Sequence, residues 1–348
     1  MNSELHKKQL ILAILRILER YSDENHPLTQ QMIKTRLEKD YNMTASNKAI
    51  KNNLELLEEF GYDICYTVIP RGSGASDIKT DYYLIHKLSD GQLQLLIDNV
   101  VFSGKLPKNQ AKELVDTLYS LSSDHFKTKA IIASMPDSAT TTNQSLFLNI
   151  ETLNEAIRRE RGVSFHYLEY HTDSKLHKRI RADGSVREYI INPYYLVTKG
   201  GRNYLICNND KHDSLSNYRV DRIADIRILE NKVRKPISAL KDSNGAPLDL
   251  KKYMDEHIYM FAGKSVRAQL RVKKFLLDEM YDRFGSSIRF KDESEDSVTA
   301  VVTANESALL QFAKELMPHI ELLSPRSVRE KLTADLTEAM RCYSAEKN

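Results

Sequence analysis

The chain has 348 residues, of which 41% are hydrophobic and 28% are charged, and its formal net charge at pH 7 is +3. This length exceeds that of one ordinary domain, so we expect two or three domains. The composition is that of a globular protein and excludes a wholly disordered chain. So small a net charge does not by itself indicate a polyanionic partner.

The cysteines and the apolar runs indicate the compartment. Cys65, Cys207 and Cys342 are far apart and have no metal-ligand spacing. We therefore expect no structural metal site and a reducing environment. Residues 1–23 have apolar positions with a helical period, which indicates an amphipathic helix rather than a signal peptide. Since no run approaches the roughly 18 apolar residues of a membrane span, we expect a cytoplasmic protein with no membrane partner.

Residues 1–87 carry the pattern of three helices and a hairpin. An apolar stripe predicts a first helix that ends near Tyr21, and Thr29 is placed to cap a second helix. Ser46 is placed to cap a third helix, which Gly61 ends. Two strand-like runs follow, around the polar tip "PRGSGASD". This order predicts a winged helix-turn-helix, whose third helix enters the major groove of DNA.

The start of the third helix and the wing carry side chains suited to DNA. Asn and Lys near a helix N-terminus reach base edges and phosphates, and cations on a wing reach the backbone. The candidate DNA-binding residues are Ser46, Asn47, Lys48, Lys51, Asn52, Arg71 and Lys79. The opposite, apolar face of this helix is expected at Ala49, Ile50, Leu54, Leu57 and Phe60. The alternative is a plain helical bundle with a solvated polar face, because residues 1–87 contain 12 Lys and Arg against 12 Asp and Glu.

Residues 88–150 are predicted to form a helical spacer and linker. Apolar residues recur at helical spacing at Leu93, Leu96, Ile97 and Val100. Leu106-Pro107 is predicted to begin a further helix, and the polar stretch "SMPDSATTTNQS" is typical of a linker. Residues 236–259 are predicted to be a second linker.

Residues 151–235 are predicted to form a small β-barrel. The stretch "NIETLNEAIRRERG" has a helical pattern that we expect to end at Gly162. Five short strand-like runs then follow, and Gly200-Gly201 gives a hairpin turn between two of them. One helix followed by five strands is typical of an SH3- or Sm-like barrel.

The hairpin sequence "NPYYLVTKGGRNYLICNN", together with the later "NYRVDRI", resembles the core of the WYL domain of bacterial transcriptional regulators. The Trp-Tyr-Leu that names this family falls on Asn203, Tyr204 and Leu205, so the Trp is replaced by Asn. The resemblance implies a basic, partly aromatic pocket that binds a nucleotide-like or nucleic-acid effector. It places Tyr167, Tyr204, Arg219 and Arg222 in that pocket, and it makes Ser164, His166 and Arg187 weaker candidates.

The residue types support an anionic ligand independently of the resemblance. Arginine gives bidentate hydrogen bonds to phosphate, and tyrosine offers a stacking face with a polar tip. Residues 171–187 contain five Lys and Arg against two Asp. The alternative is structural: the strand tyrosines would belong to the core, and Arg222 would pair with Asp221 or Asp225.

Residues 260–348 have the order β-α-β-β-α-β, which predicts a ferredoxin-like domain. A final helix follows, with Pro325 in its first turn. The arrangement is similar to the WCX-type C-terminal extension of WYL regulators, and that resemblance implies a homodimer.

Together these patterns predict an α+β multidomain chain that acts as a dimeric DNA-binding transcriptional regulator. Its partners would be double-stranded DNA and an anionic effector, which is a nucleotide, single-stranded DNA or RNA. The alternative is an accessory protein whose WYL barrel binds RNA or single-stranded DNA directly and modulates a nucleic-acid-targeting or defence system. No Gly-x-Ser-x-Gly or His-Glu-x-x-His motif occurs, so we expect neither enzymatic activity nor a cofactor.

Overall fold

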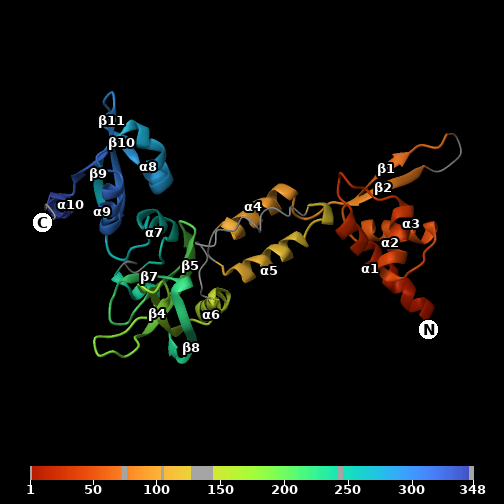
Figure 1. The fold of residues 1–348 in the computed structure, drawn as a ribbon, viewed down its shortest axis with the longest axis horizontal. Coiled ribbons are helices and arrows are strands. Elements are labelled where there is room, and N and C mark those ends of the chain that lie inside the picture. Colours follow the sequence, from red (N-terminus) through yellow and green to blue (C-terminus); the bar gives the residue numbers. More distant parts are fainter. Residues whose placement is uncertain (1, 73–76, 103–105, 127–143, 242–245, 345–348) are drawn as a thin grey trace. The chain divides into compact units, whose positions relative to one another are not determined.

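The structure is a computed structural model that describes residues 2–72, 77–102, 106–126, 144–241 and 246–344 (Figure 1). The chain divides into two compact units, Met1–Thr142 and Asn143–Asn348. Helices and several antiparallel sheets occur together, which confirms the expected α+β class. No described helix is both long enough and apolar enough to span a membrane.

The first unit begins with three helices and a two-stranded antiparallel hairpin. The helices are α1 (Asn2–Tyr21), α2 (Gln30–Tyr41) and α3 (Asn47–Glu59), and the strands are β1 (Ile64–Ile69) and β2 (Ile78–Leu84). The predicted caps are confirmed, because the Thr29 hydroxyl accepts from the Met32 amide and the Ser46 hydroxyl accepts from the Ala49 amide. The centre of the predicted wing tip, residues 73–76, lies outside the described residues.

A single apolar core holds these elements together. It contains Ile14 and Leu18 of α1, Ile33 and Leu37 of α2, and Ile50 of α3, all of them fully buried. The expectation that Phe60 belongs to this core was wrong, since its side chain is 83% exposed. The reason is that α3 ends at Glu59 and Phe60 follows it at the edge of the apolar stripe, where its ring stacks near that of Tyr62.

Two further helices complete the first unit: α4 (Asp90–Phe102) and α5 (Lys108–Tyr119), followed by the short 3-10 turn η1 (Asp124–Phe126). The buried stripe of α4 is Leu93, Ile97 and Val101. Leu96, which was predicted to lie on that face, is 43% exposed. The buried residues of α4 are spaced four apart, and Leu96 lies beside the line that they form along the helix. Residues 127–143, which include most of the predicted linker, lie outside the described part of the chain.

The turn η1 is bonded to the end of α1 and the loop after it. The Arg20 guanidinium donates to the Asp124 carboxylate at 2.8 Å, and the Ser123 hydroxyl donates to the Asp23 carboxylate at 2.6 Å. The rings of His26 and His125 are stacked with centroids 3.7 Å apart. The spacer helices are therefore tied to the three-helix part of the same unit.

The second unit begins with α6 (Leu146–Arg158) and a six-stranded antiparallel sheet, called here the β-domain. Its strands are β3 (Arg161–Tyr170), β4 (Leu176–Lys178), β5 (Glu188–Lys199), β6 (Arg202–Asn208), β7 (Leu215–Arg219) and β8 (Ile223–Val233). The order is β4-β3-β5-β6-β7, and β8 pairs with β3. Val163 of β3 pairs with both Ile191 and Ile228, so β5 and β8 lie on opposite edges of β3 and the sheet curls around it.

The five predicted strands are present, but two local expectations were wrong. The first helix ends at Arg158 rather than at Gly162, and Glu160 makes the turn with a φ of 52°. Gly162 lies inside β3, where an added Cβ would approach the Lys232 side chain to 2.7 Å, so it serves packing rather than helix termination. Within the cationic stretch 171–187, the short strand β4 was not predicted.

A connecting segment follows the β-domain, and we call its residues 249–263 the strap. It contains α7 (Leu250–Glu256), which Asp249 caps by accepting from the Lys252 amide. Tyr253 and Met260 of the strap are buried against Tyr194 and Ile206 of the β-domain. The part of the predicted second linker that the structure describes is therefore a packed element.

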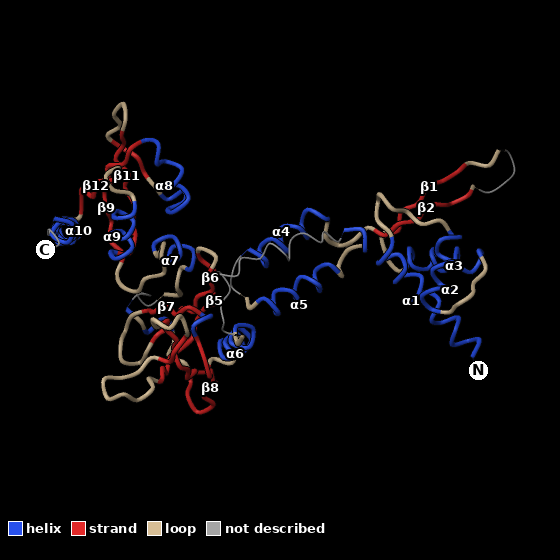
Figure 2. The backbone as a smooth tube through the Cα atoms, in the orientation of Figure 1, coloured by secondary structure: helices blue, strands red, loops and turns tan. Residues whose placement is uncertain are grey.

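The C-terminal domain is a four-stranded antiparallel sheet with helices. Its elements are β9 (Ser265–Lys273), α8 (Leu277–Phe284), β10 (Arg289–Lys291), β11 (Ser297–Asn305), α9 (Glu306–Glu315), β12 (Ile320–Ser324) and α10 (Arg326–Ser344) (Figure 2). The strand order is β10-β11-β9-β12. Phe284 of α8 and Phe312 of α9 meet edge to face at 5.1 Å in its core. Asn305 caps α9 as predicted.

Candidate ligand pocket and nucleic-acid interface

A cavity of 760 Å³ lies in the second unit, bordered by the β-domain, the strap and the C-terminal domain. The predicted residues Tyr167, Tyr204 and Arg219 all line it. They come from β3, β6 and β7, and Tyr204 lies directly opposite Arg219 in the β6–β7 pairing. The fold thus brings together three residues that are far apart in the sequence.

Arg219 is held in a fixed position at this cavity. Its Nε donates to Asp221 Oδ1 at 3.1 Å, and its Nη2 donates to Asp221 Oδ2 at 2.6 Å. Its backbone amide donates to the Tyr167 hydroxyl at 3.2 Å. The hydrogen bonds to Asp221 raise the pKa of Arg219, and burial raises the pKa of Tyr167, so one is a permanent cation and the other a neutral phenol.

The tyrosines divide into core and cavity positions. Tyr189 and Tyr194 are 4% and 3% exposed and belong to the core. Tyr189 stacks on Phe165 with ring centroids 5.6 Å apart. Tyr167 packs edge to face against Tyr218 at 5.1 Å, and both of these rings also border the cavity. Tyr189 and Tyr194 are therefore core residues rather than ligand contacts. Tyr167 both packs in the core and forms part of the cavity wall.

Four more cations line the cavity, and none of them was among the predicted effector-binding residues. Arg179 donates to Glu169 at 2.8 Å, and Arg283 donates to Glu279 at 2.8 Å. Lys199 donates to the Met254 carbonyl at 3.1 Å, and burial lowers its pKa. Arg202, next to the hairpin turn, is exposed. Five Lys and Arg side chains thus face one lining carboxylate, Glu315.

The other four candidates lie outside the lining of this cavity. The Arg222 guanidinium sits 5.1 Å from the Tyr170 ring centroid, and that of Arg187 sits 4.7 Å from the Tyr189 ring centroid. Ser164 is buried, and His166 Nδ1 lies 2.8 Å from an Asp225 oxygen. Ser164 and His166 alternate with Tyr167 along β3 and therefore face the other side of the strand. Arg222 lies in the 3-10 turn that follows β7. The pairing that Arg222 was expected to make with Asp221 is made by Arg219 instead.

In the first unit, the candidate DNA contacts lie along the start of α3. Asn47, Lys48, Lys51 and Asn52 are exposed, whereas the Ser46 hydroxyl is occupied as the helix cap. Lys51 Nζ lies 3.7 Å from a Glu55 oxygen. This stretch therefore presents two lysines and two amides to solvent.

The two wing candidates differ from each other. Arg71 is exposed next to the undescribed tip. Lys79 Nζ lies 3.8 Å from a Glu58 oxygen and 4.0 Å from the Tyr66 ring centroid, and its hydrogen bond with Tyr66 raises its pKa. Lys79 is thus held against the far end of α3.

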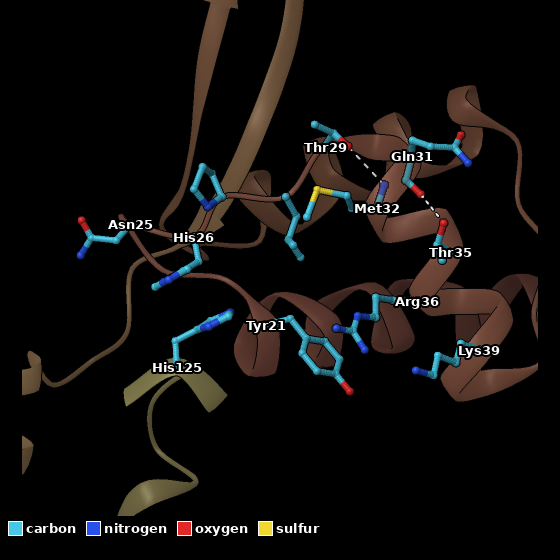
Figure 3. A pocket seen from close by; sticks show the side chains of 12 residues that line it. Tyr21, Asn25, His26, Thr29, Gln31, Met32, Thr35, Arg36, Lys39 and His125 are labelled. Atoms are coloured by element: carbon cyan, nitrogen blue, oxygen red, sulfur yellow. Dashed lines mark hydrogen bonds between the residues drawn. The ribbon is translucent and has the colours of Figure 1, made fainter. Parts of the chain in front are cut away.

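A second cavity, of 690 Å³, lies within the first unit beside η1 (Figure 3). The Arg36 guanidinium sits over the Tyr21 ring at 3.8 Å, and the stacked His26 and His125 rings lie beside them. Lys39 also lines this cavity, and its described lining holds no carboxylate. Within the residues that the structure describes, no three His, Cys, Asp or Glu side chains are grouped to hold a metal ion.

Residues 149–228 match the WYL domain family. The chain carries a WYL domain. The match runs from α6 into β8 and includes the cavity residues Tyr167, Tyr204 and Arg219. No curated protein matches the chain.

Solved structures that are similar to the chain include the following two. Proteasome accessory factor B/C (PafBC) of Arthrobacter aurescens shares 15% identity with a TM-score of 0.29, and the match covers 97% of this chain and 49% of that one. The present chain thus spans about half the length of PafBC. A CRISPR Cas-related protein of known crystal structure shares 15% identity with a TM-score of 0.37, and the match covers 98% and 86% of the two chains.

The hairpin that names the WYL domain shows how scaffold and cavity residues alternate. Asn203, at the position of the name-giving Trp, accepts from the Thr198 hydroxyl across the hairpin at 2.8 Å. Tyr204 lines the cavity, and the next residue, Leu205, is completely buried. Because successive strand residues face opposite sides, one strand supplies both the core and a wall of the WYL cavity.

Proposed function

We propose that this chain is a DNA-binding transcriptional regulator whose WYL domain senses an anionic effector, either a nucleotide or a nucleic-acid strand. The observation that carries the proposal is the convergence of Tyr204, Tyr167 and Arg219 on a cavity lined by four further cations. Arginine forks suit phosphate groups, and phenol rings suit bases. These groups serve charge recognition and stacking, so we propose binding rather than catalysis at this site.

The DNA-binding part of the proposal rests on the first unit. The order α1-α2-α3-β1-β2, with an antiparallel hairpin, supports a winged helix-turn-helix over residues 1–87. The exposed side chains at the start of α3 support its role as the recognition helix. Residues 88–150 would then be the spacer that joins this domain to the WYL domain.

The topology of the second unit supports the domain types that we propose for it. The curled sheet of β3–β8 supports an SH3- or Sm-like barrel over residues 151–235. After the connecting segment at 236–259, the β-α-β-β-α-β order and the strand order β10-β11-β9-β12 support a ferredoxin-like, WCX-type domain over residues 260–348.

A homodimer is part of the proposal, since two recognition helices would read a pseudo-palindromic site. Exposed apolar side chains on α10, such as Met340 at 68% and Tyr343 at 92%, support such contacts. The effector would act by its differential affinity for two dimer states, because a ligand shifts an equilibrium in no other way. Light scattering on the purified chain tests the dimer.

Two experiments test the function directly. Selection from random duplexes should enrich a two-fold related DNA sequence for the natural chain, and Lys48→Ala with Lys51→Ala should lose it. Mass spectrometry of co-purifying small molecules and oligonucleotides should find an anion that Arg219→Ala with Arg202→Ala lacks. Recovery of the same species from both proteins would overturn the pocket assignment.

A second candidate is the accessory protein that binds RNA or single-stranded DNA through its WYL domain. The charge distribution of the first unit favours it, because Lys51 and Lys79 lie beside Glu55 and Glu58. Duplex binding that survives the α3 double substitution but is abolished by Arg219→Ala with Arg202→Ala would support this candidate over the regulator.

A further inference from the structure

The two walls of the WYL cavity differ in chemistry. The β-domain wall presents Arg179, Lys199, Arg202 and Arg219. The strap and the C-terminal domain contribute two aromatic rings, Tyr259 and Phe261, the carboxylate of Glu315, and the guanidinium of Arg283, which donates to Glu279. Glu315 is the one carboxylate in the described lining, so a ligand that is anionic along its whole length would meet a negative charge beside it. The asymmetry suits a ligand with an anionic end and a flat end that carries hydrogen-bond donors.

Glu315 is fixed in orientation by two donors from different elements. The Tyr259 hydroxyl of the strap donates to Oε2, and the Gln311 amide of α9 donates to Oε1 at 3.1 Å. Burial, together with this hydrogen bond, raises the pKa of Tyr259, so the phenol remains a donor. A carboxylate has about four acceptor positions, and each oxygen therefore retains room for one more donor.

A stacking surface lies next to this carboxylate. The rings of Tyr259 and Phe261 are stacked with centroids 5.7 Å apart, and Phe261 is 40% exposed. The Arg283 guanidinium sits 5.3 Å from the Tyr259 ring centroid. Aromatic rings of this kind bind bases by stacking. The cavity therefore offers aromatic rings for the base of a nucleotide and cations for its phosphate.

We propose that the cavity takes a guanosine phosphate, with the phosphate at Arg202 and Arg219 and the guanine edge at Glu315. Guanine is the base with two adjacent donors, N1–H and the N2 amino group, and these match the two oxygens of one carboxylate. Adenine and cytosine present one amino group beside a ring acceptor, and uracil presents one N–H between two carbonyls. This inference rests on the proposed function, since it specifies the effector of the same cavity.

The volume of 760 Å³ is within the range of small-molecule and cofactor pockets, about 300–1,000 Å³. The same guanosine phosphate could be a free nucleotide or one unit of a strand, and the two sources share the chemistry described. The strap and α9 would then be the base-reading side of the WYL cavity, and the β-domain the phosphate-binding side.

Calorimetry on the full-length chain tests the inference with GMP, IMP, AMP, UMP and ribose 5-phosphate. We expect GMP to bind at least roughly tenfold more tightly than the others, because IMP lacks one of the two donors to a charged acceptor. A single-stranded hexamer with one central guanosine, compared with its inosine counterpart, identifies the source. Tighter binding of the hexamer than of GMP would assign the strand.

Substitutions test recognition of the base separately from binding of the phosphate. Glu315→Gln should remove the preference for GMP over IMP and leave ribose 5-phosphate binding unchanged. Glu338→Gln, an exposed carboxylate on α10, is the matched control and should behave as the natural chain. The GMP and IMP comparison uses the natural chain, so it holds even if Glu315→Gln fails to fold.

The possible outcomes distinguish failure of the guanine assignment from failure of the anion-binding function itself. Equal binding of all four nucleotides, or a GMP preference that survives Glu315→Gln, would overturn the guanine assignment and leave the anion-sensing function in place. If neither nucleotide, strand nor ribose 5-phosphate binds, the guanine assignment and the effector pocket both fail.

Discussion

The candidate cations of the two units are held in different ways. In the WYL cavity Arg219 and Arg179 are each held by a neighbouring carboxylate, Asp221 or Glu169. At the start of α3, Lys48 is exposed to solvent. A fixed arginine loses little side-chain entropy when a ligand binds, but the neighbouring carboxylate partly neutralises its charge. An exposed lysine without such a neighbour can neutralise a phosphate fully and so release the counterions bound to it. We therefore expect shape-specific binding at the WYL cavity and salt-dependent binding to a polymer at α3.

The largest effect is expected at the WYL cavity. Arg219→Ala with Arg202→Ala should weaken binding of an anionic effector about 100-fold, because two charge-assisted contacts are lost. Calorimetry with the co-purifying anion measures this effect. Arg326→Ala, a highly exposed arginine on α10, serves as the control. A loss under threefold would show that the cations do not carry the binding energy.

The next largest effect is expected at α3. Lys48→Ala with Lys51→Ala should weaken duplex binding about tenfold and reduce the slope of log affinity against log salt by about 2, since two phosphate contacts disappear. Fluorescence anisotropy at several salt concentrations measures both quantities. Lys251→Ala, an exposed lysine of the strap, should change neither. An unchanged slope would remove these lysines from the interface.

A smaller change tests how the Asp221 partner acts on Arg219. Asp221→Asn should tighten effector binding by about threefold at low salt, because Arg219 then shares its charge with no carboxylate and the gain is screened as salt rises. The same calorimetric assay checks it. Weaker binding instead would mean that Asp221 contributes mainly by orienting the guanidinium.

The smallest effect concerns the contact between η1 and the end of α1. Burial tends to raise the pKa of Asp23, but hydrogen bonds from Ser123 and His26 outweigh it and lower that pKa. A lowered carboxyl pKa gives stability that is present above the ordinary Asp value of about 3.9 and is lost as pH falls through the folded-state value. Ser123→Ala should therefore destabilise the unit by about 1 kcal/mol near neutral pH and less in acid. Urea unfolding at two pH values checks this difference, and an equal loss at both would contradict it.

Local signals predicted most of the elements. Thr29, Ser46 and Asn305 were identified as caps from sequence alone, because a cap depends only on a few neighbouring residues. Gly162 was misassigned because its environment is set by the distant Lys232, and Phe60 was misassigned because α3 ends one residue before it. No pattern within the apolar run of α4 distinguishes Leu96 from the buried Ile97.

The candidate site was predicted only in part, because several of its residues come from parts of the chain that are distant in sequence. Tyr167, Tyr204 and Arg219 were found through the WYL resemblance, which preserves positions that are distant in sequence. Arg283 and Glu315 belong to another domain, and they reach the cavity because the strap places that domain beside it. Their local sequence gives no sign of this role.

The strap has a consequence for any attempt to isolate the WYL domain. Its Tyr253 hydroxyl donates to Asn217 of β7, and Asn217 in turn donates to the Met260 carbonyl. Tyr253 and Met260 cover Tyr194 and Ile206 of the β-domain. A fragment cut at residue 235 would expose this apolar surface and tend to aggregate. A fragment that runs to residue 264 would keep Tyr253 and Met260 over this surface.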